Sequence, residues 1–200
     1  MALRFLESLK KRESFKRIIA ALRFRIVKLV QAPSIEELEF MSLTVNHGHY
    51  SEKLRRLGHP SAAEQIQKNA FFVGLRWMEL AHEHLHDAAD SLSSSSKRST
   101  FSRSYYAVYS ASKAVRYIVF GAVSLKGDDH HKASELPDDF PSGDKWAQMI
   151  PKLYEHRLFS DYDNWKSTAS QHSLTPQESY DLADLFLRDA GSYLQQKFGI

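Results

Sequence analysis

The chain of 200 residues contains no cysteine, and it has only 8 glycines and 6 prolines. Without cysteine there is no disulfide framework, no thiolate metal site and no cysteine nucleophile. No stretch reaches the roughly 18 consecutive apolar residues of a membrane-spanning helix. The N-terminus lacks the continuous apolar core of a secretory signal. These absences predict a cytoplasmic protein, and the scarcity of glycine and proline favours helices.

The net charge of +3 conceals an uneven distribution of charge along the chain. Residues 1–30 hold nine Lys and Arg against Glu7 and Glu13, a net charge of +7, and the remainder holds 18 basic and 22 acidic residues, a net charge of −4. Leucine and isoleucine recur among the cations at helical spacing, which predicts a basic amphipathic helix over residues 1–31. This helix would pack on the bundle or a partner, lie on anionic lipid or bind nucleic acid, and its many apolar residues favour packing.

Capping patterns predict two helices in the first half of the chain. Ser34 with Glu37 and Ser61 with Glu64 match the capping box, in which a side chain satisfies the first free amides of a helix. The first helix should end at Leu57, before Gly58. The second should run to about residue 92 and place one stripe in the core: Ile66, Ala70, Val73, Trp77, Leu80, Ala81, Ala88 and Leu92.

Three further helices are expected in the second half. The first covers residues 101–119 after an N-cap at Ser99 or Thr100, the second covers residues 144–159, and residues 121–143 form a loop between them. Thr175, with a proline and an acid behind it, opens the last helix. We find no convincing strand. The prediction is an all-α up-and-down bundle of four to five helices over residues 61–200, with a basic, amphipathic helical N-terminal extension over residues 1–60.

The helix over residues 101–119 has two different faces. One is apolar, and the other carries three tyrosines interleaved with three cations, which are Arg103, Tyr106, Tyr109, Lys113, Arg116 and Tyr117. Such a face packs within the bundle, forms a dimer interface, or contacts RNA through its cations while bases stack on tyrosine.

The order of the motifs resembles the HEPN domain of prokaryotes (higher eukaryotes and prokaryotes nucleotide-binding). S-R-x-Y-Y-A begins at Ser102, R-x-x-x-D-Y-D begins at Arg157, and the similarity extends over residues 65–198. The resemblance implies a helical bundle that is usually dimeric. Many members are ribonucleases of toxin–antitoxin, abortive-infection and CRISPR-linked systems, and others are non-catalytic partners of minimal nucleotidyltransferases.

The nuclease members share an arginine and a later histidine with four to six residues between them, and two such pairs cut RNA at the dimer interface without metal. Here Arg157 matches the arginine, but Tyr162, Asp163 and Asn164 stand at that spacing. RNA cleavage needs a base and an acid that titrate near neutrality, and the ordinary pKa values of tyrosine and aspartate lie far from it. Whether the protein is a metal-free ribonuclease is therefore left open by the sequence.

The candidate site residues follow from this resemblance. Arg157, Asp161 and Tyr162 are the candidates for catalysis. Arg157 and Asp161 stand four apart, so a helix would pair them, either as a structural ion pair or with the arginine left to bind an anion. Tyr162 is either a core tyrosine or a target for adenylylation, since some partners of the family modify a tyrosine near this motif. The candidates for RNA or nucleotide binding are Arg103, Tyr106, Lys113 and His131.

Two groups of histidines have simpler explanations. His82, Glu83 and His86 match H-E-x-x-H of zinc peptidases, but no third ligand follows, and a solvated helix face with His82 and His86 pointing away from the core is favoured. His130 and His131 belong to a polar loop, or His131 approaches the phosphate near Arg157 from this second segment. No metal and no cofactor are predicted.

We therefore expect a HEPN-type protein of a toxin–antitoxin or antiviral defence system that binds RNA or a nucleotide and works as a homodimer. The alternative is a non-catalytic subunit that pairs with a nucleotidyltransferase-like or other effector protein.

Overall fold

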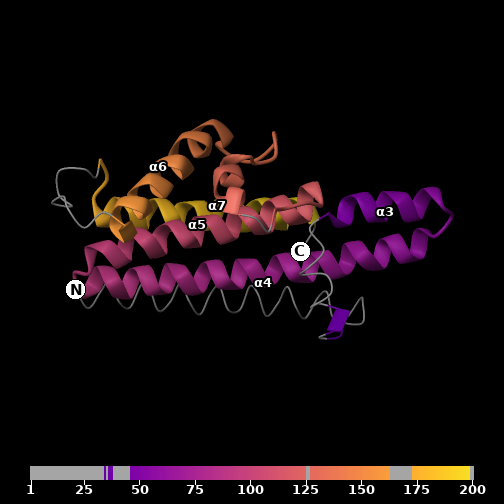
Figure 1. Ribbon diagram of the computed structural model, residues 1–200, viewed down its shortest axis with the longest axis horizontal. Helices are drawn as coiled ribbons and strands as arrows, with labels where there is room; N and C mark the ends of the chain where they lie inside the picture. The colour runs from indigo at the N-terminus through magenta and orange to yellow at the C-terminus, as the bar shows by residue number, and fades with distance from the viewer. Residues whose placement is uncertain (1–33, 35, 38–45, 125–126, 163–172, 199–200) are drawn as a thin grey trace.

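The computed structural model describes residues 34, 36–37, 46–124, 127–162 and 173–198, so the basic segment over residues 1–31 lies outside the described part, as do Asp163 and Asn164. From Asn46 onward the described residues form five α-helices and one 3-10 helix: α3 (His47–Arg56), α4 (Pro60–Ser93), α5 (Lys97–Phe120), η1 (Gly127–Ser134), α6 (Gly143–Tyr162) and α7 (Pro176–Phe198) (Figure 1). The described residues contain no strand, and the all-α helical bundle is confirmed. None of the described helices is long and apolar enough to cross a membrane.

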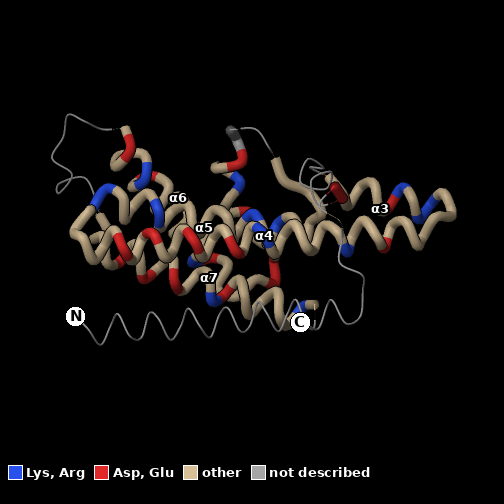
Figure 2. The backbone as a smooth tube through the Cα atoms, turned by 90° about the horizontal axis from the view of Figure 1, so that it is seen from below, with Lys and Arg blue, Asp and Glu red and all other residues tan. Residues whose placement is uncertain are grey.

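Helix α5 is the centre of the bundle, since it contacts α4, α6, α7 and η1. Helix α4 has 34 residues, about 50 Å at 1.5 Å per residue, and it turns back into α5 through three serines, Ser94, Ser95 and Ser96. The first turns of α4 extend beyond the end of α5, and α3 lies along that part (Figures 1 and 2). The division of the chain after residue 60 stays a prediction, although α3 packs directly on α4.

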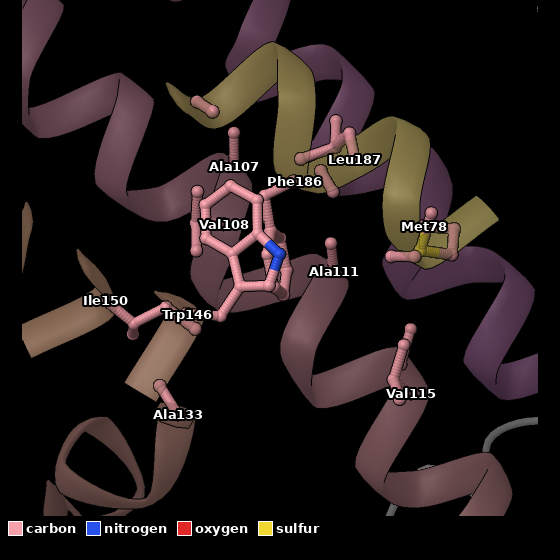
Figure 3. Close-up of a cluster of buried hydrophobic side chains, with 14 of the residues drawn as sticks. Met78, Ala107, Val108, Ala111, Val115, Ala133, Trp146, Ile150, Phe186 and Leu187 are labelled. Carbon is pink, nitrogen blue, oxygen red and sulfur yellow. The ribbon is translucent and has the colours of Figure 1, made fainter. Parts of the chain in front are cut away.

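The core lies where α4, α6 and α7 pack on α5, and it is centred on the indole of Trp146 (Figure 3). Trp146 is fully buried and meets the ring of Phe186 edge to face, with 4.9 Å between ring centroids. Its Nε1 donates to Oδ2 of Asp189 at 3.0 Å, so the buried indole N–H is satisfied. Small residues of α5, among them Ala107 and Ala111, let α6 and α7 approach this closely (Figure 3).

Helix α3 is fixed to the end of α5 by two glycines and a histidine. The amide of Gly48 donates to the carbonyl of Gly121 at 3.0 Å, and Gly121 has a φ of +73°. A Cβ on Gly121 would lie 2.6 Å from the Cα of Gly48, so only glycine fits. Beside them, Nε2 of His47 donates to the carbonyl of Tyr117 at 2.7 Å. Burial lowers the pKa of His47, so the ring stays neutral.

The capping box of Ser34 and Glu37 is confirmed, but the prediction of one continuous helix over residues 34–57 is wrong. The Ser34 amide donates to Glu37 Oε2 at 2.8 Å, and the Glu37 amide donates to Ser34 Oγ at 3.1 Å. Asn46 is not helical, with a φ of −143°, and its side chain accepts from the amide of His49, so a new helix begins there. The predicted stop before Gly58 is confirmed, since that residue has a φ of +83°.

The start and the core stripe of α4 also differ from the prediction. Proline at position 60 opens the helix after His59, and no side chain caps it, so the box of Ser61 and Glu64 is wrong. Leu80 is 38% exposed, whereas the sequence reading placed it in the core. Met78 and Leu85 are buried instead, because the contact with α5 follows the Ala70–Ala81–Ala88 face.

The remaining boundaries follow the prediction with small shifts. The N-cap of α5 is Ser96, three to four residues before the expected position, and Thr100 lies in the first turn, where its Oγ1 donates to the Ser96 carbonyl at 2.9 Å. The expected loop over residues 121–143 includes η1. At α7 the box is confirmed: the Thr175 amide donates to Glu178 Oε2 at 2.7 Å, and the Glu178 amide donates back to Thr175 Oγ1 at 3.2 Å.

Candidate functional site

Arg157 lies in the last turns of α6, with its guanidinium held between two tyrosines. Its Nη2 donates to the hydroxyl of Tyr106 on α5 at 2.6 Å and to that of Tyr162 at 3.3 Å. The guanidinium carbon lies 5.3 Å from the ring centre of Tyr106 and 5.0 Å from that of Tyr162. The side chain of Arg157 is 11% exposed, whereas Tyr162 is 68% exposed. Tyr162 is therefore not a core tyrosine.

Asp161 supplies the counter-charge of Arg157 from one turn later on α6. Its Oδ2 lies 2.9 Å from Nε of Arg157, and the hydroxyl of Ser102 reaches the same oxygen at 3.4 Å. Burial opposes the charge of Arg157, but Tyr106, Tyr162 and Asp161 outweigh it and raise its pKa above the ordinary value. The structure thus brings together the three candidates for catalysis and Tyr106, around a cation that stays charged at any physiological pH.

His84 of α4 lies next to Tyr106 and Arg103, and the sequence analysis did not assign it to the site. Its Nδ1 is 3.3 Å from Nη1 of Arg103, and its ring centroid is 5.6 Å from that of Tyr106. Arg103 also lies 3.7 Å from Asp87 of α4. Burial, and then the charge of Arg103, lower the pKa of His84, so its neutral form predominates at pH 7.

His130 of η1, rather than His131, is the histidine that meets the tyrosines of α5. Its Nδ1 lies 2.7 Å from the hydroxyl of Tyr105, and its ring stacks on those of Tyr109 and Tyr154 at centroid distances of 4.4 and 5.4 Å. Its ring also faces that of Tyr106 edge-on at 6.3 Å. His131 is exposed and touches the edge of Tyr154 at 5.7 Å. The segment that carries both histidines does reach the site, but through His130 and not through the predicted His131.

The charge of Arg157 acts on His130. Burial is the largest cause of the lowered pKa of His130, and Arg157 is the next. Burial also raises the pKa of Tyr105 far above its ordinary value, so the phenol stays protonated. It can therefore donate to His130, which then carries its own proton on Nε2.

The C-terminal half of the tyrosine–cation face holds η1 in place. Asp129 accepts from Nη1 and Nη2 of Arg116 at 2.9 and 3.1 Å and from the hydroxyl of Tyr109 at 2.8 Å. Lys113 lies 3.8 Å from the same carboxylate, and its side chain is only 14% exposed. Burial opposes ionisation of Asp129, but Arg116, Tyr109 and Lys113 hold its pKa below the ordinary value. The predicted RNA contact Lys113 is thus engaged inside the protein, away from Arg157.

The H-E-x-x-H run does not form one polar face. Nε2 of His82 is buried, so the expectation that this side chain points away from the core is wrong, and this burial lowers the pKa of His82 to about 4. His86 is exposed, and its Nδ1 lies 3.0 Å from Asp90. Among the described residues, no group of three histidines and acids lies close enough to hold a metal ion.

Comparisons with protein-family models, curated proteins and solved structures found no significant match. The HEPN resemblance and the function that it implies therefore stay predictions.

Proposed function

We propose that this is a HEPN-like protein of a toxin–antitoxin or antiviral defence system, and that it binds RNA or a nucleotide through Arg157. The observation that supports this proposal is the position of the Arg157 guanidinium between Tyr106 and the exposed Tyr162. A guanidinium fork matches the oxygens of a phosphate, and an exposed aromatic ring beside it offers a surface on which a base stacks.

Binding, rather than cleavage, is the primary activity that we propose. Cleavage of RNA by its own 2′-hydroxyl needs one group that accepts a proton and another that donates one to the leaving oxygen. Asp161 is tied to Arg157 as its counter-ion, and the hydroxyl of Tyr162 accepts a hydrogen bond from Nη2 of the same arginine. Neither residue replaces the histidine that is missing from the motif.

The test measures the affinity for a short single-stranded oligonucleotide that carries 2′-O-methyl groups, so that it binds but is not cleaved through its own 2′-hydroxyl. With a rhodamine label and fluorescence anisotropy, Arg157→Ala should weaken binding about tenfold, the typical effect of losing a charge-assisted phosphate contact. Arg188→Ala is the matched control, because Arg188 forms the same kind of i,i+4 pair with Asp184 on α7 at 3.2 Å. Equal affinity of wild type and Arg157→Ala would reject the proposal.

A parallel assay with unmodified RNA and EDTA separates binding from cleavage. Products that form with wild type but not with Arg157→Ala would show a metal-free ribonuclease and would overturn the order of the two activities proposed above. Intact RNA in both samples agrees with a protein that only binds.

The second candidate is a non-catalytic subunit of a complex with a nucleotidyltransferase-like or other effector protein. The pairing of Arg157 with Asp161 favours it, because the guanidinium already has its counter-charge within the chain. Purification of the tagged protein at its native level tests this candidate: a stoichiometric complex with a nucleotidyltransferase-like protein supports it, and a pure homo-oligomer contradicts it. Light scattering on the same sample tests the proposed homodimer.

A further inference from the structure

We propose that His130 couples anion binding at Arg157 to proton uptake: as a phosphodiester occupies the site, the His130 ring takes one proton from solvent. The inference rests on the proposed binding function and adds its regulation by pH. It predicts that the protein holds RNA more tightly in a mildly acidic medium than in a neutral one.

The position of His130 beside Arg157 comes from contacts that both residues share. The hydroxyl of Tyr106 accepts from Nη2 of Arg157, while the ring of Tyr106 faces that of His130. Tyr154, on which His130 stacks with an interplanar angle of only 9°, lies one helical turn before Arg157 on α6. Two independent elements, α5 and α6, thus bring the imidazole and the guanidinium to the same place.

The groups around His130 disfavour its charged form in the empty site. Burial is the main cause that opposes a positive charge on His130, and the cations Arg157 and Lys113 and the neighbouring His131 add to it. Asp129 acts in the opposite direction but is already neutralised by Arg116 and Lys113. Tyr105, Tyr106, Tyr109 and Tyr154 complete the surroundings as phenols, which carry no charge to stabilise an imidazolium.

An anion at Arg157 reverses this balance. A phosphodiester brings one negative charge, which offsets the effect of the guanidinium and favours a proton on the neighbouring imidazole of His130. The hydrogen bond at Nδ1 does not prevent protonation, because the Tyr105 hydroxyl is able to accept as well as donate. By linkage, a proton that is taken up on binding makes the affinity rise as the pH falls.

The experiment uses the full-length protein and the labelled 2′-O-methyl oligonucleotide, whose internal phosphodiesters do not titrate near neutrality. Between about pH 7.5 and about pH 6, wild type should bind about fivefold more tightly, within the roughly 30-fold that uptake of one proton allows over about 1.5 pH units. His130→Gln should bind with less than about a twofold change over that range. His86→Gln, the same change at an exposed histidine of α4, should keep the wild-type profile.

Calorimetry of wild type in two buffers with different ionisation enthalpies provides a second readout that needs no variant. The difference in binding heat should correspond to uptake of about half a proton or more per site near the pKa of free histidine. A flat pH profile with no uptake, or a profile that survives in His130→Gln, overturns the coupling while Arg157-dependent binding stands. If Arg157→Ala binds like wild type, the proposed function fails, and the inference fails with it.

Discussion

The hydroxyl of Tyr106 on α5 lies 2.6 Å from Nη2 of Arg157 on α6, although 51 residues separate them in the sequence. This hydrogen bond joins the two motifs on which the resemblance depends. It also fixes the guanidinium of Arg157 relative to α5, and its loss should be measurable.

Tyr106→Phe should lower the free energy of unfolding by about 1–2 kcal/mol, because a hydrogen bond to a charged group is lost while the ring stays in place. Tyr162→Phe is the control, since its hydroxyl makes a longer contact of 3.3 Å on an exposed ring. Urea denaturation followed by circular dichroism measures both. Equal effects of the two variants would show that the Tyr106 contact does not stabilise the fold.

Asp129→Asn should destabilise the protein by about 3 kcal/mol, because it leaves the buried Arg116 without its counter-ion. The exposed Asp139, which pairs with Lys197 at 2.9 Å, provides the control, and Asp139→Asn should have a much smaller effect. The double variant Arg116→Met with Asp129→Leu should recover part of the loss, since apolar replacement of a buried pair removes both desolvation costs. Failure of the double variant to exceed Asp129→Asn in stability would contradict this account.

Gly121→Ala should destabilise the protein more than Gly58→Ala, although both glycines have a positive φ, of +73° and +83°. At position 58 the Cβ of alanine would meet open space. The only cost there is the left-handed backbone conformation, which destabilises the protein by about 1 kcal/mol. At position 121 its Cβ would also press on the Cα of Gly48, so α3 must move. Thermal melts of the two variants give the difference, and equal melting temperatures would argue against the glycine contact.

The free energy of unfolding should fall as the pH decreases from about 6.5 to about 4.5, since the unfolded chain binds protons there that the native state excludes. The pKa of His82 is lowered from 6.5 to about 4 by burial. The neutral His82 ring contributes on the order of 2–3 kcal/mol at most to the free energy of unfolding. This contribution is fully present above the pKa of His82 in the unfolded chain, and it is lost as the pH falls toward the pKa of His82 in the folded protein. His82→Leu should flatten this slope, whereas His86→Gln, at an exposed position of the same helix, should keep it.

Local patterns in the sequence were sufficient to predict the helices of the bundle, because capping residues and apolar spacing act within a turn or two. Thr175 with Glu178 is such a pattern, and its two hydrogen bonds are present. The break at Asn46 was missed, since one asparagine within a polar stretch does not distinguish a cap from a helix interior. Likewise, Leu80 and Met78 are equally apolar, and only the packing against α5 decides which of them is buried.

The site was predicted in part, for a similar reason. The pair of Arg157 and Asp161 follows from helical spacing, and the structure contains it. The nearby histidines, His84 and His130, come from α4 and η1, and no pattern along the chain indicates that both face Tyr106. Lys113 was predicted to bind a ligand, and for Arg116 the sequence left packing and RNA contact open, because their partner Asp129 lies beyond the end of α5, in η1.

The different surroundings of α3 and α5 imply a hierarchy of opening motions. Among the described elements, α5 is enclosed by four others, whereas α3 rests on α4 and on the glycine contact at the end of α5. Amide protons of α5 should therefore exchange with solvent only when the whole bundle unfolds, and those of α3 through a local detachment that costs far less. The half of the molecule that holds Arg157 and Tyr106 would stay closed during that detachment, so the two ends of α4 are able to fluctuate independently.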